Sequence, residues 1–309
     1  MKETLYRQIC ENLIPIVYPK GFTLQYLTFH NKNKMSRRKT IPLHKNRQEM
    51  FVDVLTADED LVDPHKAMTA HLLLGTGIRN DTCGHVHKFW FTYRGDELYL
   101  DVPDFDNCRK EIDKARKGPD SNKNVCSSCE RSGDGGYTPK TPTSAGRQLL
   151  IPNSYKNHAT GEVEYFGLKD RCERYFAFDE PTAPAGSKYG FDMIQADGKD
   201  GFSTGFANKA VRAVGAKSDI NPTLRRKRLI QEGVPNDQIR KFGTNKEGDK
   251  IPDIVAHDMR ASYCTQLARN DTRTAYAMTK TGHKLEETFY RYVNFARNEL
   301  DKNVDKSMF

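Results

Sequence analysis

The stretch that decides the fold runs from His257-Asp-Met-Arg260 through Gly282-His283 to Tyr292. The histidine and the arginine of the first motif lie three residues apart, so they share one face of a predicted helix. The second histidine and the tyrosine follow about one helix-turn-helix later. With Arg79 far upstream, this set suits the cutting of a DNA phosphodiester without a metal. Arginines neutralise the phosphate, histidines handle protons and a tyrosine attacks.

The order of these motifs resembles that of the tyrosine recombinase, or phage integrase, family over roughly residues 60–295. Gly282-His283 follows Arg260 by 22 residues, and Tyr292 follows His283 by nine. The resemblance also makes Lys140, in Thr138-Pro-Lys140 before a predicted strand, the lysine that protonates the leaving 5′ oxygen. The catalytic set that it implies is Arg79, Lys140, His257, Arg260, His283 and Tyr292, with Tyr292 attacking the phosphorus to form a 3′-phosphotyrosyl bond.

Each of these residues also has an ordinary interpretation when it is taken alone. Arg79 is then a surface arginine after the Gly-rich turn 75–78, Lys140 a lysine on a loop, and His257 a helix-capping residue. Tyr290 is a rival nucleophile, but its spacing from His283 is two residues shorter than that of Tyr292. The combination of four motifs in the right order favours the catalytic interpretation.

The composition is that of a soluble globular protein. The chain has 309 residues, of which 37% are hydrophobic and 29% charged, enough for one large domain or two modest ones. Apolar runs such as 13–17 and 72–74 are far too short to span a bilayer. The N-terminus has no apolar core of a signal peptide. We therefore expect a cytoplasmic protein associated with the nucleoid and with no membrane partner.

Positive charge is concentrated at the N-terminus. Residues 1–50 hold ten Lys and Arg against three Asp and Glu, a net charge of +7 out of +8 for the whole chain. Such a basic arm predicts a segment that grips phosphates, although a solvated tail kept for solubility has the same composition. Phosphate contacts are also expected from predicted helices nearer the C-terminus, where a solvated helix face is the alternative. The predicted DNA-binding residues are Arg37, Arg38, Lys39, Lys209, Arg212, Arg225, Arg226 and Arg228.

The apolar patterns predict an α+β fold that is mainly helical, with a small antiparallel sheet. Asp63-Pro64 starts a helix that Gly75 and Gly77 end. A hairpin follows, with strands at 89–93 and 98–102, and a third strand spans 147–151. The chain from Pro152 to Phe206 is expected to be irregular. Further helices are expected at 206–214, 224–231, 257–269, 273–279 and from 286 to the C-terminus. Residues 1–58 are predicted to be a small DNA-gripping segment and 59–309 the catalytic domain.

A Cys-rich insertion at about 104–137 separates the second and third predicted strands. Its Cys108, Cys126 and Cys129 suit one tetrahedral zinc ion, with Cys83, His85 or His87 as the fourth ligand. Three ordinary reduced cysteines in a loop are the alternative. The layout resembles archaeal and archaeal-virus integrases with Cys-rich inserts. The zinc would be structural, because the predicted chemistry needs no cofactor.

These patterns together predict a site-specific recombinase, such as the integrase of a virus or mobile element, that assembles as a tetramer on double-stranded DNA. Chromosome-dimer resolution is the alternative within this class. A non-catalytic DNA-binding regulator derived from a recombinase and a type IB-like topoisomerase are alternatives outside it. A zinc-finger-type binding module is disfavoured, since the cysteines occupy too little of the chain.

Overall fold

The main body of the protein begins near residue 38. The computed structural model describes residues 40, 42–57, 61–111, 125–133, 135–158, 160–181, 187–218 and 254–307. Residues 38–309 form one compact unit, and 1–37 are a separate unit that lies outside the described residues. Helix α2 (Lys45–Thr56) buries Phe51, Val52 and Leu55 in the main core. The division therefore falls after Arg37, whereas the sequence suggested a boundary near residue 58.

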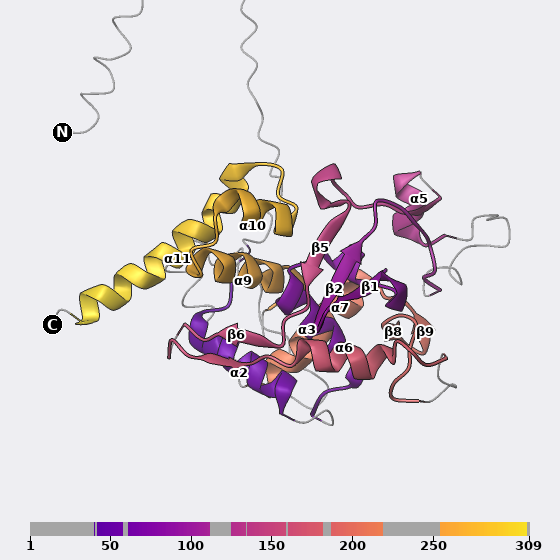
Figure 1. Ribbon diagram of the computed structural model, residues 1–309, viewed down its shortest axis with the longest axis horizontal. Helices are drawn as coiled ribbons and strands as arrows, with labels where there is room; N and C mark the ends of the chain where they lie inside the picture. Colours follow the sequence, from indigo (N-terminus) through magenta and orange to yellow (C-terminus); the bar gives the residue numbers. More distant parts are fainter. Residues whose placement is uncertain are drawn as a thin grey trace, which may run out of the picture. The chain divides into compact units, whose positions relative to one another are not determined.

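The elements of the described chain are mostly helices joined by short strands (Figure 1). None of these helices is long and apolar enough to cross a membrane. The helices are α2 (Lys45–Thr56), α3 (Pro64–Thr76), α4 (Asn80–Cys83), α5 (Ser127–Ser132), α6 (Leu168–Phe176), α7 (Thr204–Lys217), α9 (Ala256–Arg269), α10 (Thr274–Thr281) and α11 (Glu286–Ser307), with 3-10 turns η2 (Lys88–Trp90) and η4 (Pro142–Ser144). The strands are β1 (Phe91–Arg94), β2 (Glu97–Val102), β3 (Asp106–Asn107), β4 (Gly136–Tyr137), β5 (Arg147–Leu150), β6 (Ser154–Lys156), β7 (Val163–Tyr165), β8 (Gln195–Ala196) and β9 (Lys199–Asp200).

Helix α3 is the central element of the core. The Asp63 side chain accepts a hydrogen bond from the Lys66 backbone N–H (3.1 Å), and Pro64 occupies the first turn, as the sequence predicted. Every residue from 67 to 76 is buried, because α3 packs against α7, α9 and α6. The helix ends at Gly77, whose φ of 61° places it in the left-handed region.

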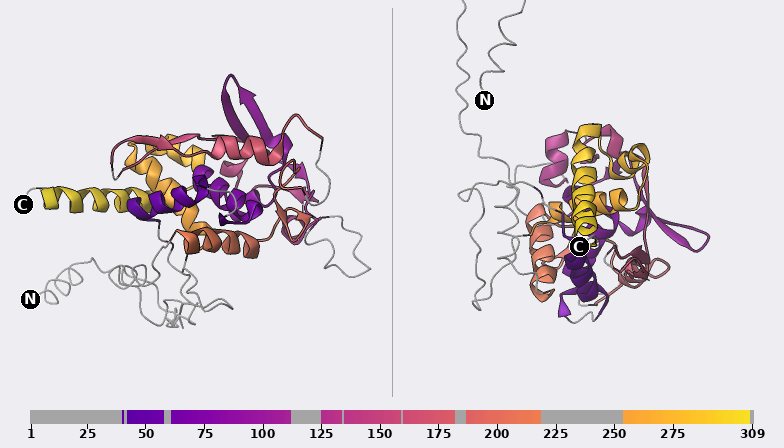
Figure 2. Two further views of the ribbon diagram at one scale, coloured as in Figure 1. Left: turned by 90° about the horizontal axis from the view of Figure 1, so that it is seen from below. Right: turned by 90° about the vertical axis from the view of Figure 1, so that its left-hand side faces the viewer.

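A three-stranded antiparallel sheet with the order β1-β2-β5 lies beside these helices. Leu100 of β2 pairs with Phe91 of β1 and with Leu149 of β5. Buried and more exposed residues alternate along β2, so one face of the strand packs on the core. The β1–β2 hairpin projects from the body in both views of Figure 2. The predicted hairpin and third strand are confirmed, although η2 delays the start of β1 to Phe91.

The stretch after Pro152 is not irregular, contrary to the expectation from sequence. It contains the β6–β7 and β8–β9 hairpins and helix α6. Helix α6 has few apolar residues, but Leu168, Cys172, Tyr175 and Phe176 all lie on its buried side. These positions have the i, i+4, i+7, i+8 spacing of an amphipathic helix, so the sequence did carry the helical signal and the expectation of irregular chain was wrong here. The predicted helix 224–231 lies outside the described residues.

The C-terminal helices confirm the remaining helix predictions. Helix α11 packs along α9, and α10 contacts both (Figure 1). Gly282 ends α10 with a φ of 66°. A Cβ atom added at Gly282 would lie 2.5 Å from the Oγ atom of Ser144. The chain therefore needs glycine here both for its backbone conformation and for the close approach of η4.

Candidate functional site

Arg260 joins two turns that lie far apart in the sequence. Its side chain is 3% exposed on α9. Its Nη1 donates to the Gly77 carbonyl (2.6 Å) and its Nη2 to the Thr281 carbonyl (2.5 Å). These carbonyls lie two residues before Arg79 and two residues before His283. The rigid, planar guanidinium of Arg260 therefore holds the turn before Arg79 next to the turn before His283.

Arg79 lies at the N-terminus of α4, directly after the left-handed turn at Gly77. It donates to Ser144 Oγ, and its Nη2 donates to the Gly282 carbonyl (3.4 Å). Burial, followed by the neighbouring charge of Arg260, lowers the pKa of Arg79 to about 10. The guanidinium therefore stays protonated at neutral pH, and two arginine cations lie close together where an anion would relieve their repulsion.

His283 is neutral at physiological pH in the free protein. Burial and then the charges of Arg260 and Arg79 lower its pKa to about 3. Its Nδ1 lies 2.6 Å from Thr281 Oγ1, which itself donates to the Ala277 carbonyl (2.8 Å). The Thr281 hydroxyl must therefore accept from Nδ1–H. This leaves Nε2 of His283 unprotonated and able to accept a proton.

Tyr292 lies beside His283 in the same chain. Their ring centroids are 5.8 Å apart, and Tyr292 packs on a small core cluster that contains Phe289 and Cys264. Burial and the nearby Cys264 raise the pKa of Tyr292 to about 12, although Arg260 opposes this shift. The phenol is therefore protonated at neutral pH. Tyr290 is 42% exposed, and its pKa is raised by a hydrogen bond with Glu286, so Tyr292 is the tyrosine that lies against the site.

His257 and Lys140 lie at the open edge of the site. His257 is on the first turn of α9, and both side chains are exposed. The surrounding atoms nevertheless lower the pKa of His257 by desolvation, and Arg260, Arg79 and Lys140 lower it further. The charge of Lys140 thus acts on His257. All six residues that the sequence selected are brought to one region.

Sequence reasoning missed a third arginine at this site. Arg147, the first residue of β5, is 5% exposed; its Nε donates to the Ser144 carbonyl (3.0 Å) and its Nη1 to the Lys280 carbonyl (2.7 Å). Its buried Nη2 has no hydrogen-bond partner among the described residues. Burial, then Arg260 and Arg79, lower its pKa to about 10. The only sequence signal was its place at the start of a strand seven residues after Lys140.

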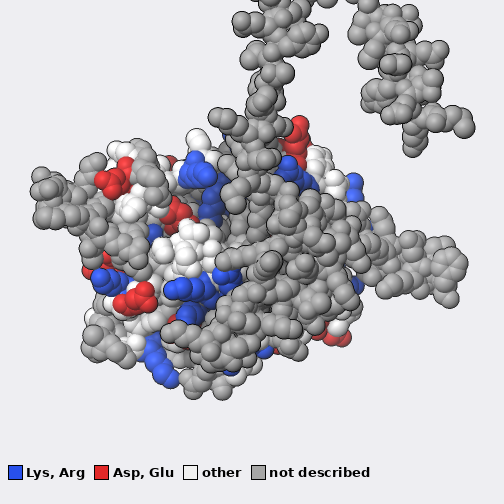
Figure 3. Space-filling view, turned by 180° about the vertical axis from the view of Figure 1, so that it is seen from behind, with Lys and Arg blue, Asp and Glu red and all other residues white. Residues whose placement is uncertain are grey.

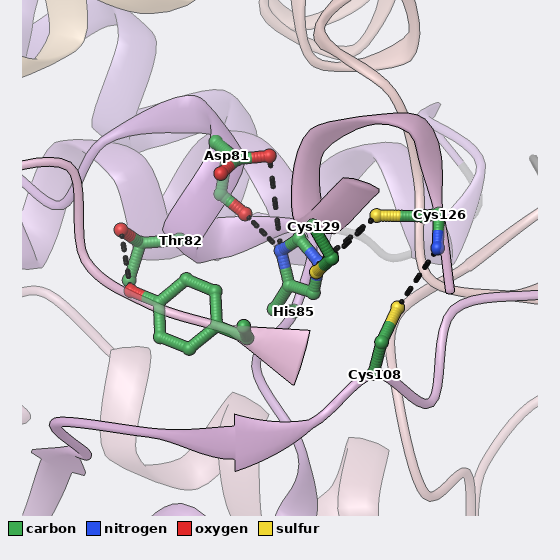
Figure 4. A network of polar contacts seen from close by, with 7 residues as sticks. Asp81, Thr82, His85, Cys108, Cys126 and Cys129 are labelled. Carbon is green, nitrogen blue, oxygen red and sulfur yellow. Dashed lines mark hydrogen bonds and ion pairs between the residues drawn. The ribbon is translucent and has the colours of Figure 1, made fainter. Parts of the chain in front are cut away.

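Four potential metal ligands converge beside α4. We call His85, Cys108, Cys126 and Cys129 the His–Cys cluster; all four are buried, and their ligand atoms lie within 4.8 Å of one another (Figure 4). Hydrogen bonds with Cys126 and Cys129 lower the pKa of Cys108, while bonds with Cys108 and Cys126 raise that of Cys129. The three thiols therefore hold their protons unequally, because each hydrogen bond between two of them stabilises the thiolate of one and the thiol of the other.

Of the three residues considered as a fourth ligand, only His85 belongs to the cluster. Cys83 is fully buried in the main core, and burial raises the pKa of its thiol. His87 uses Nδ1 to accept from the Phe89 backbone N–H (3.2 Å) and stacks on the ring of that residue. Neither residue is placed to complete the set.

Only two of the eight predicted DNA-binding residues lie in the described chain. Lys209 is exposed on α7, whereas the half-buried Arg212 donates from Nε to the Ile254 carbonyl (3.2 Å). Arg212 therefore secures the segment that leads into α9. On the face drawn in Figure 3, basic and acidic side chains are interspersed over the described surface. The residues that lie outside the described chain are Arg37, Arg38, Lys39, Arg225, Arg226 and Arg228.

Comparisons with known proteins give similarity in structure alone. No protein-family model and no curated protein sequence matches the chain. A structure of XerH site-specific recombinase bound to palindromic difH substrate has a TM-score of 0.46 and 12% identity, covering 94% of this chain and 59% of its own. The chain thus spans about three-fifths of the length of that recombinase.

Two further structures are similar to the chain. The Tn1549 transposon integrase in complex with transposon right-end DNA has a TM-score of 0.44 and 14% identity, with coverage of 98% of this chain and 76% of the integrase. XerA recombinase has a TM-score of 0.44 and 11% identity, with coverage of 97% and 72%. By their own descriptions, the similar structures are two recombinases and an integrase. At these identities no shared activity follows, and a function must be argued from the side chains.

Proposed function

We propose that the chain is a site-specific DNA recombinase that cuts and rejoins double-stranded DNA through a 3′-phosphotyrosyl intermediate. The observation that carries the proposal is the bridge made by Arg260. It brings Arg79 and His283 to the same place, with Tyr292 beside His283. Two protonated guanidiniums, a neutral imidazole and a phenol are the groups that an attack on a phosphodiester requires.

The charges of the site suggest how the reaction proceeds. Arg79 and Arg260 bind the non-bridging oxygens of the phosphate and stabilise the negative charge of the transition state. The bound phosphate offsets the charges of Arg260 and Arg79 that lower the pKa of His283, so His283 becomes a stronger base. The Tyr292 oxygen then forms a bond to phosphorus as its proton passes to Nε2 of His283. The bond from phosphorus to the 5′ oxygen breaks, and that oxygen takes a proton from Lys140. Attack by a 5′ hydroxyl on the phosphotyrosine reverses these steps and rejoins the strand.

The same chemistry defines the partners of the chain. Exchange between two sites needs four active sites on two DNA duplexes, so we infer that four copies assemble on DNA, as expected for the integrase of a virus or mobile element. His257, at the open edge, contacts the phosphate beside Lys140. Cleavage itself uses no cofactor, and the His–Cys cluster holds a structural zinc ion outside the reaction.

Covalent capture of DNA tests the proposal. The full chain is incubated with fragmented DNA of its source genome and denatured, and the DNA that stays attached to protein is sequenced. We expect capture by the wild type and by Tyr290→Phe, which is the matched control, and none by Tyr292→Phe. Loss of capture in Tyr290→Phe but not in Tyr292→Phe would show that Tyr290 is the nucleophile. DNA binding without capture by any variant would instead support a non-catalytic regulator.

Covalent capture alone does not distinguish a recombinase from a topoisomerase, because both would form a phosphotyrosyl bond to DNA. Once the captured site is known, two copies of it are placed on one supercoiled plasmid. We expect deletion or inversion of the intervening DNA. Relaxation of supercoils without recombinant products would refute strand exchange while leaving the phosphotyrosyl chemistry intact.

A further inference from the structure

We propose that a zinc ion in the His–Cys cluster ties together the two turns that carry Arg79 and Lys140, so that the metal assembles the active site without taking part in the reaction. The catalytic consequence rests on the proposed function. The metal site and its mechanical connection to both turns rest on the cluster alone.

The distances between donor atoms suit zinc. Cys126 Sγ and Cys129 Sγ lie 3.6 Å apart, and each lies 3.3 Å from His85 Nε2. Tetrahedral zinc with ordinary bond lengths places two sulfurs roughly 3.8 Å apart and a sulfur and a nitrogen roughly 3.5 Å apart. The backbone N–H of Cys126 donates to Cys108 Sγ (3.2 Å), which stabilises a thiolate there. With Cys108, three sulfurs and one nitrogen lie within 4.8 Å of one another, close enough for one ion to bind all four after a small contraction.

A neighbouring carbonyl determines which tautomer of the His85 ring is present. Nδ1 lies 2.7 Å from the backbone oxygen of Asp81, which can only accept a hydrogen bond. Nδ1 therefore carries the proton, and the lone pair of Nε2 points at the sulfurs of Cys126 and Cys129 (Figure 4). A carbonyl that holds the distal nitrogen of a ligating histidine is the usual outer partner of a zinc site.

A redox-active pair is a poorer interpretation of the same cysteines. Cys126 is fully buried and Cys129 is 2% exposed, so neither sulfur is open to a partner thiol. The three cysteines of the cluster form no disulfide in the described chain, and the 3.6 Å between Cys126 Sγ and Cys129 Sγ is far longer than the roughly 2.05 Å of a disulfide bond. The histidine would have no role in a disulfide.

On one side, the cluster holds the turn that carries Arg79. Arg79 precedes α4, and His85 follows it, with its backbone N–H donating to the Thr82 carbonyl (2.9 Å). The His85 ring closes the same short helix by its bond to Asp81. A helix of one turn has little stability of its own. A metal bond to Nε2 would therefore fix the direction in which α4 begins, and so the position of Arg79.

On the other side, the cluster holds the turn that carries Lys140. Cys126 and Cys129 lie at α5, and the chain then returns through β4 to Tyr137. The Tyr137 ring lies 4.8 Å from that of His85, and its hydroxyl donates to Thr82 Oγ1 (3.0 Å). Lys140 follows three residues later. The metal, His85 and Tyr137 thus form a continuous connection between α4 and the lysine turn.

The metal is tested first on the purified full chain. Metal content is measured by mass spectrometry, and zinc is exchanged for cobalt, whose absorption spectrum reports sulfur ligands. We expect about one zinc per chain in the wild type and in the control Cys172→Ser, which removes a buried cysteine of α6, and none in Cys129→Ser. Absence of metal from the wild type, a cobalt spectrum without thiolate bands, or a Cys126–Cys129 disulfide would overturn the site.

The connection is tested by amide hydrogen exchange with and without the metal. We expect faster exchange in 79–83 and 136–140 after chelation, with unchanged exchange in the distant β6–β7 hairpin. Unchanged exchange in both segments would refute the connection even if zinc is bound. This measurement does not depend on catalysis. It therefore tests the connection even if the protein never captures DNA and the proposed function is wrong.

Tyr137→Phe separates metal binding from the connection. The variant keeps the ring beside His85 and loses the hydroxyl bond to Thr82. We expect Tyr137→Phe to have an unchanged zinc content. Its DNA capture should be roughly fivefold slower than that of the wild type, which is the effect of one lost hydrogen bond. Removal of the metal should slow DNA capture by roughly tenfold or more. The control is Tyr155→Phe, which loses a bond to Glu164 elsewhere. Equal capture rates in Tyr137→Phe and the wild type, in a protein that is active, would overturn the role of Tyr137.

Discussion

Arg147→Lys tests whether the buried third arginine positions the candidate active site. Lysine keeps the positive charge, so the electrostatic field on a phosphate changes little. It cannot reproduce the two simultaneous bonds of the guanidinium to the carbonyls of Ser144 and Lys280. Ser144 accepts from Arg79, and Lys280 lies three residues before His283. The variant therefore loosens the contact between two turns that carry catalytic candidates.

The size of the effect follows from the number of bonds lost. A hydrogen bond from a charged group contributes roughly 1.5–3 kcal/mol, and lysine retains at most one of the two. We therefore expect the free energy of unfolding to fall by roughly 1.5–3 kcal/mol. A displacement of the turns by about 1 Å would slow covalent capture roughly 100-fold, with little change in DNA affinity because the charge is kept.

Arg171→Lys is the matched control. Arg171 is also a buried arginine that joins two elements, since it donates to His71 Nδ1 (3.1 Å) and to the Leu55 carbonyl, but it lies on α6. Urea unfolding measures stability, and single-turnover capture is measured where all variants are folded. Both variants should lose stability, and only Arg147→Lys should lose capture. Wild-type capture by a destabilised Arg147→Lys would refute a positioning role.

Two further predictions concern pH and backbone conformation. The pKa of His283 is lowered in the folded state, so its contribution to stability is present above its unfolded pKa of roughly 6.5 and is lost as pH falls towards 3. At about 1.4 kcal/mol for each unit of the pKa difference, His283→Asn should therefore reduce the acid sensitivity of urea unfolding between those values by up to roughly 4–5 kcal/mol, and an unchanged pH profile would contradict the assigned burial. Gly77→Ala combines a φ of 61° with a Cβ atom 2.3 Å from Tyr263 Cδ1, whereas Gly95→Ala has a φ of 60° and nothing within 4 Å. Gly77→Ala should cost about 1–3 kcal/mol more than Gly95→Ala in thermal or urea unfolding, and equal losses would show that the packing contact is unimportant.

The sequence was most informative where a long periodic pattern coincided with clear end signals. Helices α3, α9 and α11 follow from apolar spacing, with Asp63-Pro64 at the start of α3 and Gly77 at its end. Helix α6 was not predicted, although its apolar residues have helical spacing, because it has only nine residues and one of its charged side chains, Arg171, is buried with them. Local pattern fails when a charged side chain is satisfied by partners that are distant in sequence.

The catalytic candidates could be chosen from motif spacing, but the buried connections between them could not. Nothing in the sequence near Arg147 indicates that it bonds the carbonyl of Lys280, 133 residues away. The fourth member of the His–Cys cluster was likewise undecided between Cys83, His85 and His87. All three follow Arg79 within eight residues, and only the turn after α4 determines which one faces the cysteines.

The sequence by itself determined which side chains are candidates for the chemistry. They were chosen by their spacing along the chain, which is a local property that does not depend on distant contacts. It also determined the principal helices and the order of the sheet strands in the chain. Only the tertiary structure decided that Arg260 bridges Gly77 and Thr281 and that His85, rather than Cys83 or His87, belongs to the His–Cys cluster. Those outcomes depend on the folding of segments up to about 200 residues apart onto one another, and no local pattern encodes such contacts.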